Sequence, residues 1–118
     1  MSYTCVLIDP VTKEELTTDV PHQIRGGTYQ MGGSERLWLN VTYNYSDHFI
    51  RVLHKESLSG LEGMTGAESI PLLKKAISEL KDDASDNYWE STEGNAKQAL
   101  CGLLALAQMR PDGVWRVT

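Results

Sequence analysis

A chain of 118 residues has the length of a single domain, here residues 1–118, and with 41% hydrophobic residues it can bury a core of its own. Acidic residues number 16 and basic residues 11, and the formal charge of −5 argues against direct binding of nucleic acid through its phosphates. The longest apolar run, residues 99–107, is far shorter than the roughly 20 residues of a membrane span, and residues 1–8 lack a basic signal-peptide start, so we expect a cytoplasmic protein without a membrane partner.

The first part of the chain predicts strands joined by turns. Residues 3–8, YTCVLI, are β-branched and aromatic enough for a strand, and Asp9-Pro10 signals a turn. Residues 15–20 predict a second strand. We expect Pro21 to stop it, because proline cannot donate a hydrogen bond to a strand ladder.

Residues 36–45, RLWLNVTYNY, alternate with a period of two, which is typical of a half-buried strand. The strand leads into Ser46 and Asp47, which are good helix caps, and a helix is predicted from there to about Lys55. The strand face expected toward the core carries Leu37, Leu39, Val41, Tyr43 and Tyr45. The face expected toward solvent carries Trp38, Asn40, Thr42 and Asn44.

The rest of the chain predicts helices. Thr65 and Glu68 have the spacing of a capping box before an amphipathic helix, although Pro71 removes a backbone donor and either distorts the first turn or moves the helix start toward itself. Thr92 can cap a last helix, residues 93–110, which is apolar on nearly all sides between residues 99 and 107. The apolar stripe of the earlier helix consists of Ile70, Leu73, Ala76, Ile77 and Leu80.

The order of these elements, strands first and helices after, indicates an α+β fold. A short closing strand is predicted at residues 114–117, after Pro111 has ended the last helix. We expect a small antiparallel sheet of three to four strands packed against three helices. The last helix is expected at the centre because its apolar surface must be buried.

The sequence lacks the motifs of familiar chemistry. It contains no nucleophile elbow, P-loop or dinucleotide fingerprint, and no Cys/His spacing that resembles a metal site. His48, beside Asp47, is typical of an exposed helix start rather than a catalytic base. Cys5 and Cys101 lie in apolar runs, so both are expected to be reduced, buried and slow to react. We expect no catalytic residue, no metal and no cofactor, and therefore not an enzyme.

An acidic stretch lies between the last two predicted helices. Residues 79–93 contain six acids, one base and two aromatic side chains. Such a stretch can hold a divalent cation, dock the basic surface of a partner with the aromatic residues as anchors, or form a solvated loop whose aromatic residues fold back onto the core. The residues assigned to the docking alternative are Asp82, Asp83, Asp86, Tyr88, Trp89, Glu90 and Glu93.

The polar face of the predicted strand is a second candidate. A planar ligand can stack on a tryptophan there and hydrogen-bond to the amides, with an arginine for a phosphate. A single small domain offers only a shallow pocket, so such a binder is expected to be a homo-oligomer. A cross-strand ladder without function fits the pattern equally well. The residues assigned to the ligand alternative are Arg25, Arg36, Trp38, Asn40, Thr42 and Asn44.

Two segments together, NVTYNYS and NYWESTEGNAKQALCGLLALA, with TGAESIPLLKKAI between them, resemble a family of small proteins encoded by bacteriophages, prophages and similar mobile elements. The resemblance covers roughly residues 25–113. It brings no fold, activity or catalytic residue with it. What it implies is an accessory protein expressed by a phage in the cytoplasm of a bacterial host cell, and small accessory phage proteins commonly bind and disable a host factor.

These observations lead us to expect a non-enzymatic binding protein that inhibits a component of the host's anti-phage defence, such as an effector nuclease complex targeted by anti-CRISPR proteins. Its partner would be a host protein or complex with a basic surface. The alternative is an oligomeric protein that sequesters a small ligand such as a signalling nucleotide. An enzyme of unrecognised type comes third.

Overall fold

The computed structural model describes the backbone of residues 1–26 and 29–118 and the side chains of residues 1–18 and 36–118. Strands and helices follow one another as expected for an α+β fold, with three α-helices and two short 3₁₀ turns, η1 and η2. The elements are β1 Ser2–Ile8, β2 Thr17–Gly26, β3 Tyr29–Arg36, β4 Trp38–Thr42, η1 Tyr43–Tyr45, α1 Ser46–Val52, η2 Ser57–Leu61, α2 Gly66–Ser78, α3 Glu93–Met109 and β5 Val114–Val117.

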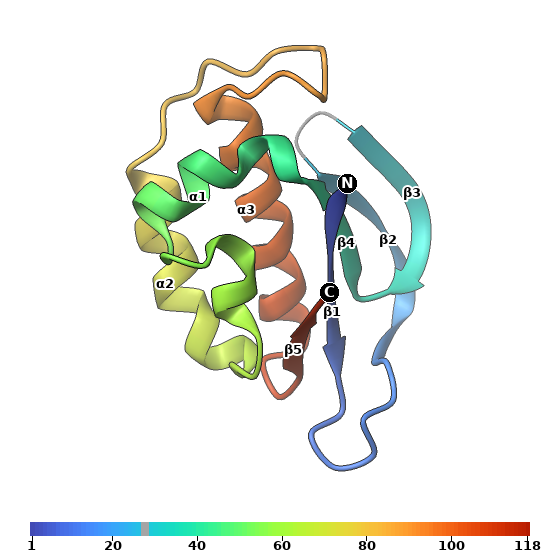
Figure 1. Cartoon of the computed structure of the whole chain (residues 1–118). Helices are drawn as coiled ribbons and strands as arrows, with labels where there is room; N and C mark the ends of the chain where they lie inside the picture. The colour runs from blue at the N-terminus through green and yellow to red at the C-terminus, as the bar shows by residue number, and fades with distance from the viewer. Residues whose placement is uncertain (27–28) are drawn as a thin grey trace.

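The main sheet is antiparallel, with the strand order β4-β1-β5, and β2 and β3 form a separate two-stranded hairpin. In the register of the main sheet, Cys5 lies opposite Leu39, and Leu7 lies opposite Trp115. All four of these side chains are buried. The helices lie together on one side of the strands, and α3 lies between α2 and the strands, as expected (Figure 1).

A buried hydrogen-bond chain ties the closing strand to α2. Trp115 is fully buried, and its Nε1–H donates to Oγ of Ser69 at 2.8 Å. The Ser69 hydroxyl in turn donates to the carbonyl of Gly66 at 2.8 Å, in the first turn of α2. Each polar group in this series of hydrogen bonds has a partner. The hydrogen bond to Ser69 replaces the one that the indole N–H would make to water, so the ring can be buried.

The capping box that opens α2 is confirmed. The backbone N–H of Glu68 donates to the Thr65 hydroxyl at 3.0 Å, and the N–H of Thr65 donates to the Glu68 carboxylate at 3.0 Å. The hydrogen bond that the carboxylate accepts from the Thr65 N–H is the main reason that the pKa of Glu68 is lowered. With both ends of the first turn fixed in this way, α2 begins at Gly66 and accommodates Pro71 inside the helix.

Two expectations about strands are wrong in detail. Strand β2 does not stop at Pro21 but runs from Thr17 to Gly26. Its pairing with β3 shifts register between Thr17 and His22, so Pro21 lies in an irregular stretch, which is where strands tolerate proline. Strand β4 is also shorter than the alternating pattern, because the chain turns into η1 after Thr42.

That early turn changes the environment of several residues. The Thr42 side chain, expected in solvent, is buried and accepts a hydrogen bond from the N–H of Asn44 at 3.2 Å. Tyr43, expected in the core, is 40% exposed. Thr42 therefore caps η1. The helix α1 that follows starts without a side-chain cap, although Ser46 and Asp47 were expected to provide one.

Helix α3 is central but not buried on all sides. Leu103 and its neighbours on one face are buried, whereas Cys101 and Ala105 are exposed on the other. The expectation that Cys101 is buried is therefore wrong. A small apolar side chain on the outer face of a helix adds to an apolar sequence pattern without requiring burial.

We expect the two thiols to differ in reactivity. Burial raises the pKa of Cys5 to about 12, so its thiolate is scarce at any pH at which the protein is handled. The pKa of Cys101 is also raised by partial desolvation, with Lys97 opposing the shift, but its sulfur is reachable. Alkylation of the native protein, followed by mass spectrometry, should modify Cys101 alone and faster as the pH rises. Equal rates for both cysteines would contradict the structure.

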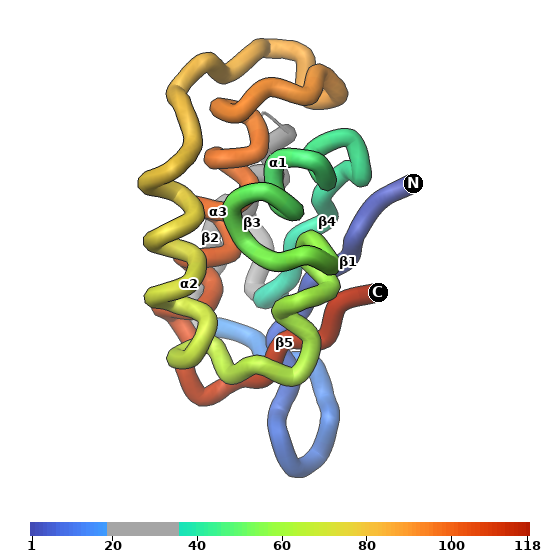
Figure 2. Tube along the Cα trace, turned by 60° about the vertical axis from the view of Figure 1, so that its left-hand side comes forward, coloured from blue at the N-terminus to red at the C-terminus, as the bar shows by residue number. Residues whose placement is uncertain are grey.

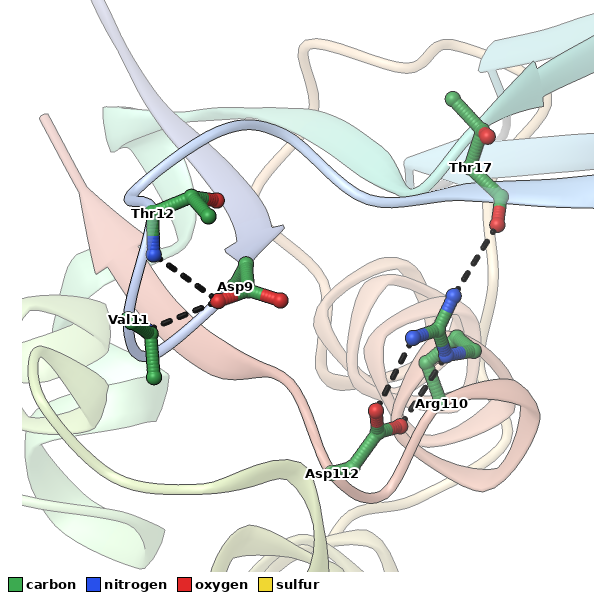
Figure 3. A network of polar contacts seen from close by, with 6 residues as sticks. All are labelled: Asp9, Val11, Thr12, Thr17, Arg110 and Asp112. Atoms are coloured by element: carbon green, nitrogen blue, oxygen red, sulfur yellow. Dashed lines mark hydrogen bonds and ion pairs between the residues drawn. The ribbon is translucent and has the colours of Figure 1, made fainter.

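Two carboxylates shape the turns that follow β1 and α3 (Figure 3). Asp9 accepts from the N–H groups of Thr12 at 2.9 Å and Val11 at 2.8 Å, and these hydrogen bonds lower its pKa. Arg110 donates to Asp112 through two nitrogens, which lowers the pKa of the Asp112 carboxyl. The expected turn at Asp9-Pro10 is thus present.

The outer edge of β5 is covered by the chain that precedes α2. The N–H of Trp115 donates to Met64 O at 2.8 Å, and the N–H of Gly63 donates to Trp115 O at 2.9 Å. The N–H of Val117 donates to the Glu62 carboxylate at 3.1 Å.

Among the residues described, no helix is long and apolar enough to cross a membrane.

Candidate functional site

The acidic stretch forms one long loop between α2 and α3. Residues 81–92, called the Trp89 loop below, contain no helix or strand. The loop extends past the end of α2 and returns to the start of α3, at the end of the molecule opposite the β1–β2 turn (Figures 1 and 2). A loop of this length needs specific contacts to keep one conformation.

A buried asparagine provides the first of these contacts. Asn95, in the first turn of α3, is fully buried. Its Nδ2 donates to the carbonyls of Asn87 at 3.0 Å and Glu90 at 2.9 Å, and its Oδ1 accepts from the N–H of Ser85 at 2.9 Å. One side chain thus fixes three points of the loop backbone. The sequence reasoning missed this residue.

The two ends of the loop are also fixed. Asp83 accepts from the N–H of Gly94 at 2.9 Å, and Thr92 caps α3 by accepting from the N–H of Asn95 at 3.0 Å. The loop crosses so close to α3 that a Cβ at Gly94 would collide with the backbone of Ala84. The glycine is therefore needed for this close approach.

Tyr88 attaches the middle of the loop to the sheet. Its hydroxyl accepts from the N–H of Thr42 at 2.9 Å and lies 3.4 Å from the carbonyl of Asn40, on the side of β4 that faces away from β1. The buried hydroxyl of Tyr45 donates to the Tyr88 carbonyl, and the two rings meet edge to face with centroids 5.8 Å apart. Burial is the main reason that the pKa of Tyr45 is raised, with Tyr88 second.

Trp89, next in the chain, is 61% exposed, although one side of its ring meets the Tyr88 ring edge to face with centroids 4.9 Å apart. Its backbone is nevertheless held, because its N–H donates to Asn87 Oδ1 at 3.1 Å and its carbonyl accepts from Asn44 Nδ2 at 2.8 Å. Of the two aromatic residues, then, Tyr88 packs toward the core and Trp89 does not. The expectation of a loop with both rings folded onto the core is wrong for Trp89.

The end of the loop runs beside α1. The Nε2 atom of His48 lies 3.2 Å from the carbonyl of Ser91, and Arg51 pairs with Glu93 at 3.1 Å. The hydrogen bond from Asn44 to the Trp89 carbonyl adds a third contact between the same two segments. Helix α1 and the loop therefore form one continuous surface.

Several of the loop carboxylates have partners. Asp82 pairs with Lys97 at 2.6 Å but keeps 87% of its side chain exposed, and Glu90 accepts from the Ser85 hydroxyl at 2.7 Å. Together with Asp83 and Glu93, these contacts shape the loop. Among the described side chains, no group of three or more His, Cys, Asp or Glu residues could hold a metal ion.

The polar strand face is built into the sheet. Asn40 donates to Ser2 at 2.9 Å and to Thr4 at 3.3 Å, across β1 and β4. The Arg36 guanidinium lies over the Trp38 ring, 4.7 Å from its centroid, and also pairs with Glu15 at 2.9 Å. The side chain of Arg25 falls outside the described residues. Thr42 and Asn44, assigned to this face, instead meet the Trp89 loop, through the backbone N–H of Thr42 and the side chain of Asn44.

The Tyr88 hydroxyl can be tested by its removal. Tyr88→Phe leaves the N–H of the buried Thr42 without its partner, so we expect the free energy of unfolding to fall by about 1–3 kcal/mol. Tyr43→Phe, on an exposed ring, is the matched control and should change it by less than about 0.5 kcal/mol. Urea denaturation of both variants measures the difference, and equal stability would show that water replaces the hydroxyl.

The structure thus joins the two sets of residues that the sequence presented separately. Tyr88 contacts the backbone of β4, and Asn44 contacts the backbone of Trp89. The resulting surface carries one exposed indole on a fixed loop, with acids around it. No family model, curated protein or solved structure matches this chain.

Proposed function

We propose that this chain is a non-enzymatic binding protein that inhibits a host anti-phage defence component by occupying its surface, with the Trp89 loop as the main contact. The observation that carries the proposal is Trp89, which is 61% exposed on a loop whose backbone is held at several points. Tryptophan is enriched among the residues that dominate the energy of protein interfaces. Its exposure costs the free protein apolar burial, which a partner would restore.

The fixed backbone of the loop supports a binding role. Asn95, Tyr88 and Asn44 hold it before any partner arrives. A loop that is already ordered loses less conformational entropy on binding, so more of the contact energy appears as affinity. A loop that merely connected two helices would not need a buried amide to define its path.

The charge of the loop supports a basic partner. Residues 81–93 contain five acids and one base, a sum of −4. Counting Lys97 and Arg51, which pair with Asp82 and Glu93, the sum is −2. An acidic rim around an apolar anchor suits a protein surface with lysine and arginine side chains, and it disfavours nucleic acid. The phage origin suggested by the sequence supplies the cellular setting of the proposal.

The inhibitory role can be tested in cells. A phage restricted by a defined defence system should plate efficiently on bacteria that express the protein and remain restricted on bacteria that express Trp89→Ala. Val11→Ala is the matched control, since Val11 is 84% exposed in the turn between β1 and β2, and that turn lies at the end of the molecule opposite the loop (Figure 1). Restriction by every system of a broad panel in the presence of the wild-type protein would overturn the proposal.

Once the inhibited component is identified, association and dissociation rates distinguish the contribution of the acidic residues from that of Trp89. Replacing Asp82, Asp83 and Asp86 with Asn should mainly slow association and flatten its salt dependence, because exposed charges act at long range. Trp89→Ala should mainly speed dissociation and cost about 2 kcal/mol or more of binding free energy. Circular dichroism must show that each variant is folded. A folded Trp89→Ala variant that binds at full strength would exclude this interface.

A further inference from the structure

We infer that the partner surface continues from the Trp89 loop onto η1 and helix α1, where Tyr43 of η1 and Asp47 and Ile50 of α1 form a second row of contacts. The partner that fits both rows is a folded protein surface on which an apolar strip is flanked by lysine and arginine side chains. This inference rests on the proposed function and extends it to a second element of the fold.

The first step is the attachment of the loop to α1. Asn44 lies in η1, and His48 and Arg51, three residues apart, lie on one side of α1. Their partners are Trp89, Ser91 and Glu93, in the same order along the loop. The loop and the helix therefore run side by side over this whole length, and a partner seated on Trp89 meets α1 next.

The second step is the exposed row beside those contacts. Tyr43, Asp47 and Ile50 precede Asn44, His48 and Arg51 by one residue each. Asp47 and Ile50 therefore lie on the neighbouring side of α1, and Tyr43 precedes them in η1. Tyr43 is 40% exposed, Ile50 is 48% exposed, and Asp47 is also exposed. The described side chains include six exposed large hydrophobic residues, and three of them, Tyr43, Ile50 and Trp89, belong to this one surface.

The third step is the area that a stable complex requires. A typical specific interface covers roughly 800 Å² on each partner, whereas one buried aromatic side chain contributes about 150–250 Å². Trp89 alone is too small an anchor. The row on η1 and α1 adds exposed apolar surface on elements attached to the loop, and Tyr43 is held in place by Tyr3, whose ring centroid lies 4.5 Å away.

The fourth step is the chemistry of the partner. An acid, Asp47, stands between the two apolar side chains of the row, and Glu90 lies on the loop next to Trp89. Basic side chains that meet these acids must therefore alternate with apolar ones on the partner. Such a pattern is found on folded basic protein surfaces rather than on a purely ionic ligand.

Photocrosslinking in cells tests this surface even while the partner is unidentified. Tyr43, Ile50 and Trp89 are replaced, one at a time, with p-benzoylphenylalanine in the full chain. Val11, in the turn between β1 and β2, and Met109, the last residue of α3, are both exposed and are replaced in the same way as controls. After irradiation in bacteria, mass spectrometry identifies each adduct and the partner residue that carries it.

We expect positions 43, 50 and 89 to capture the same host protein, on one of its surfaces rich in lysine and arginine, and positions 11 and 109 not to capture it. Ile50→Asp should then weaken binding of the purified pair on the order of tenfold, while Ile50→Val leaves it nearly unchanged. Capture from position 89 alone would overturn the extension onto α1 and leave the proposed function standing. Absence of a specific adduct from all three positions would overturn both.

Discussion

Leu103→Ala should lower the free energy of unfolding by about 2–5 kcal/mol. Leu103 is fully buried in the cluster that joins α3 to the sheet and to α2. Truncation removes apolar contacts and leaves a cavity that the surrounding helices and strands can only partly fill. Urea denaturation, analysed at constant slope, measures the change.

Leu104→Ala is the matched control for this prediction. The residue type, helix and neighbouring position are the same, but Leu104 is only partly buried at the rim of the cluster. Its truncation should cost clearly less than that of Leu103. Equal losses would mean that the rim is as closely packed as the centre, and a loss below roughly 1 kcal/mol for both would mean that α3 is peripheral.

Asn95→Ala should release the Trp89 loop and cost about 2–4 kcal/mol, because it leaves one loop N–H and two loop carbonyls without their buried partner. Amide hydrogen exchange should show the loss first within residues 85–92, since the helices and the sheet do not depend on these bonds. If the chain binds a host component as proposed, the same variant should bind it more weakly although Trp89 itself is unchanged, because the loop must then be ordered during binding.

Asn44→Ala is the control for the buried amide. It also removes an amide bonded to a loop carbonyl, that of Trp89, but Asn44 is exposed and water can replace it. We expect less than about 1 kcal/mol of lost stability and unchanged exchange within residues 85–88. If the two asparagine variants behaved alike, Asn95 would not be the residue that defines the path of the loop.

Signals contained in short segments predicted the fold well. Thr65 with Glu68, and Thr92 with the helix after it, marked the starts of α2 and α3, because a helix cap depends only on residues within one turn. The run at residues 114–117 was correctly interpreted as the closing strand. The α+β arrangement followed from the order of these elements, and the central place of the last helix followed from its apolar surface.

The errors arose where the same residue type fits two structures. Thr42 suits both a strand and a capping position, so the alternating pattern did not show that the strand ends there. An apolar helix of small residues did not reveal that Cys101 lies on its outer face. For the candidate site, the sequence left open whether Trp89 is buried, because tryptophan serves both in cores and in interfaces. Asn95 went unnoticed because its partners depend on the path of the loop, although an uncharged polar residue just after a helix cap is a signal worth testing.

The Tyr88 hydroxyl has a consequence for how this protein behaves at high concentration. With residues 62–64 bonded along β5 and Tyr88 placed against β4, the described parts of the main sheet present few unpaired backbone groups that could template a strand from another chain. The loop that carries the exposed tryptophan therefore also opposes aggregation through the edge of the sheet. Detachment of the loop uncovers the edge of β4 in a molecule that already exposes an indole, so variants that loosen the loop should precipitate on concentration before they unfold.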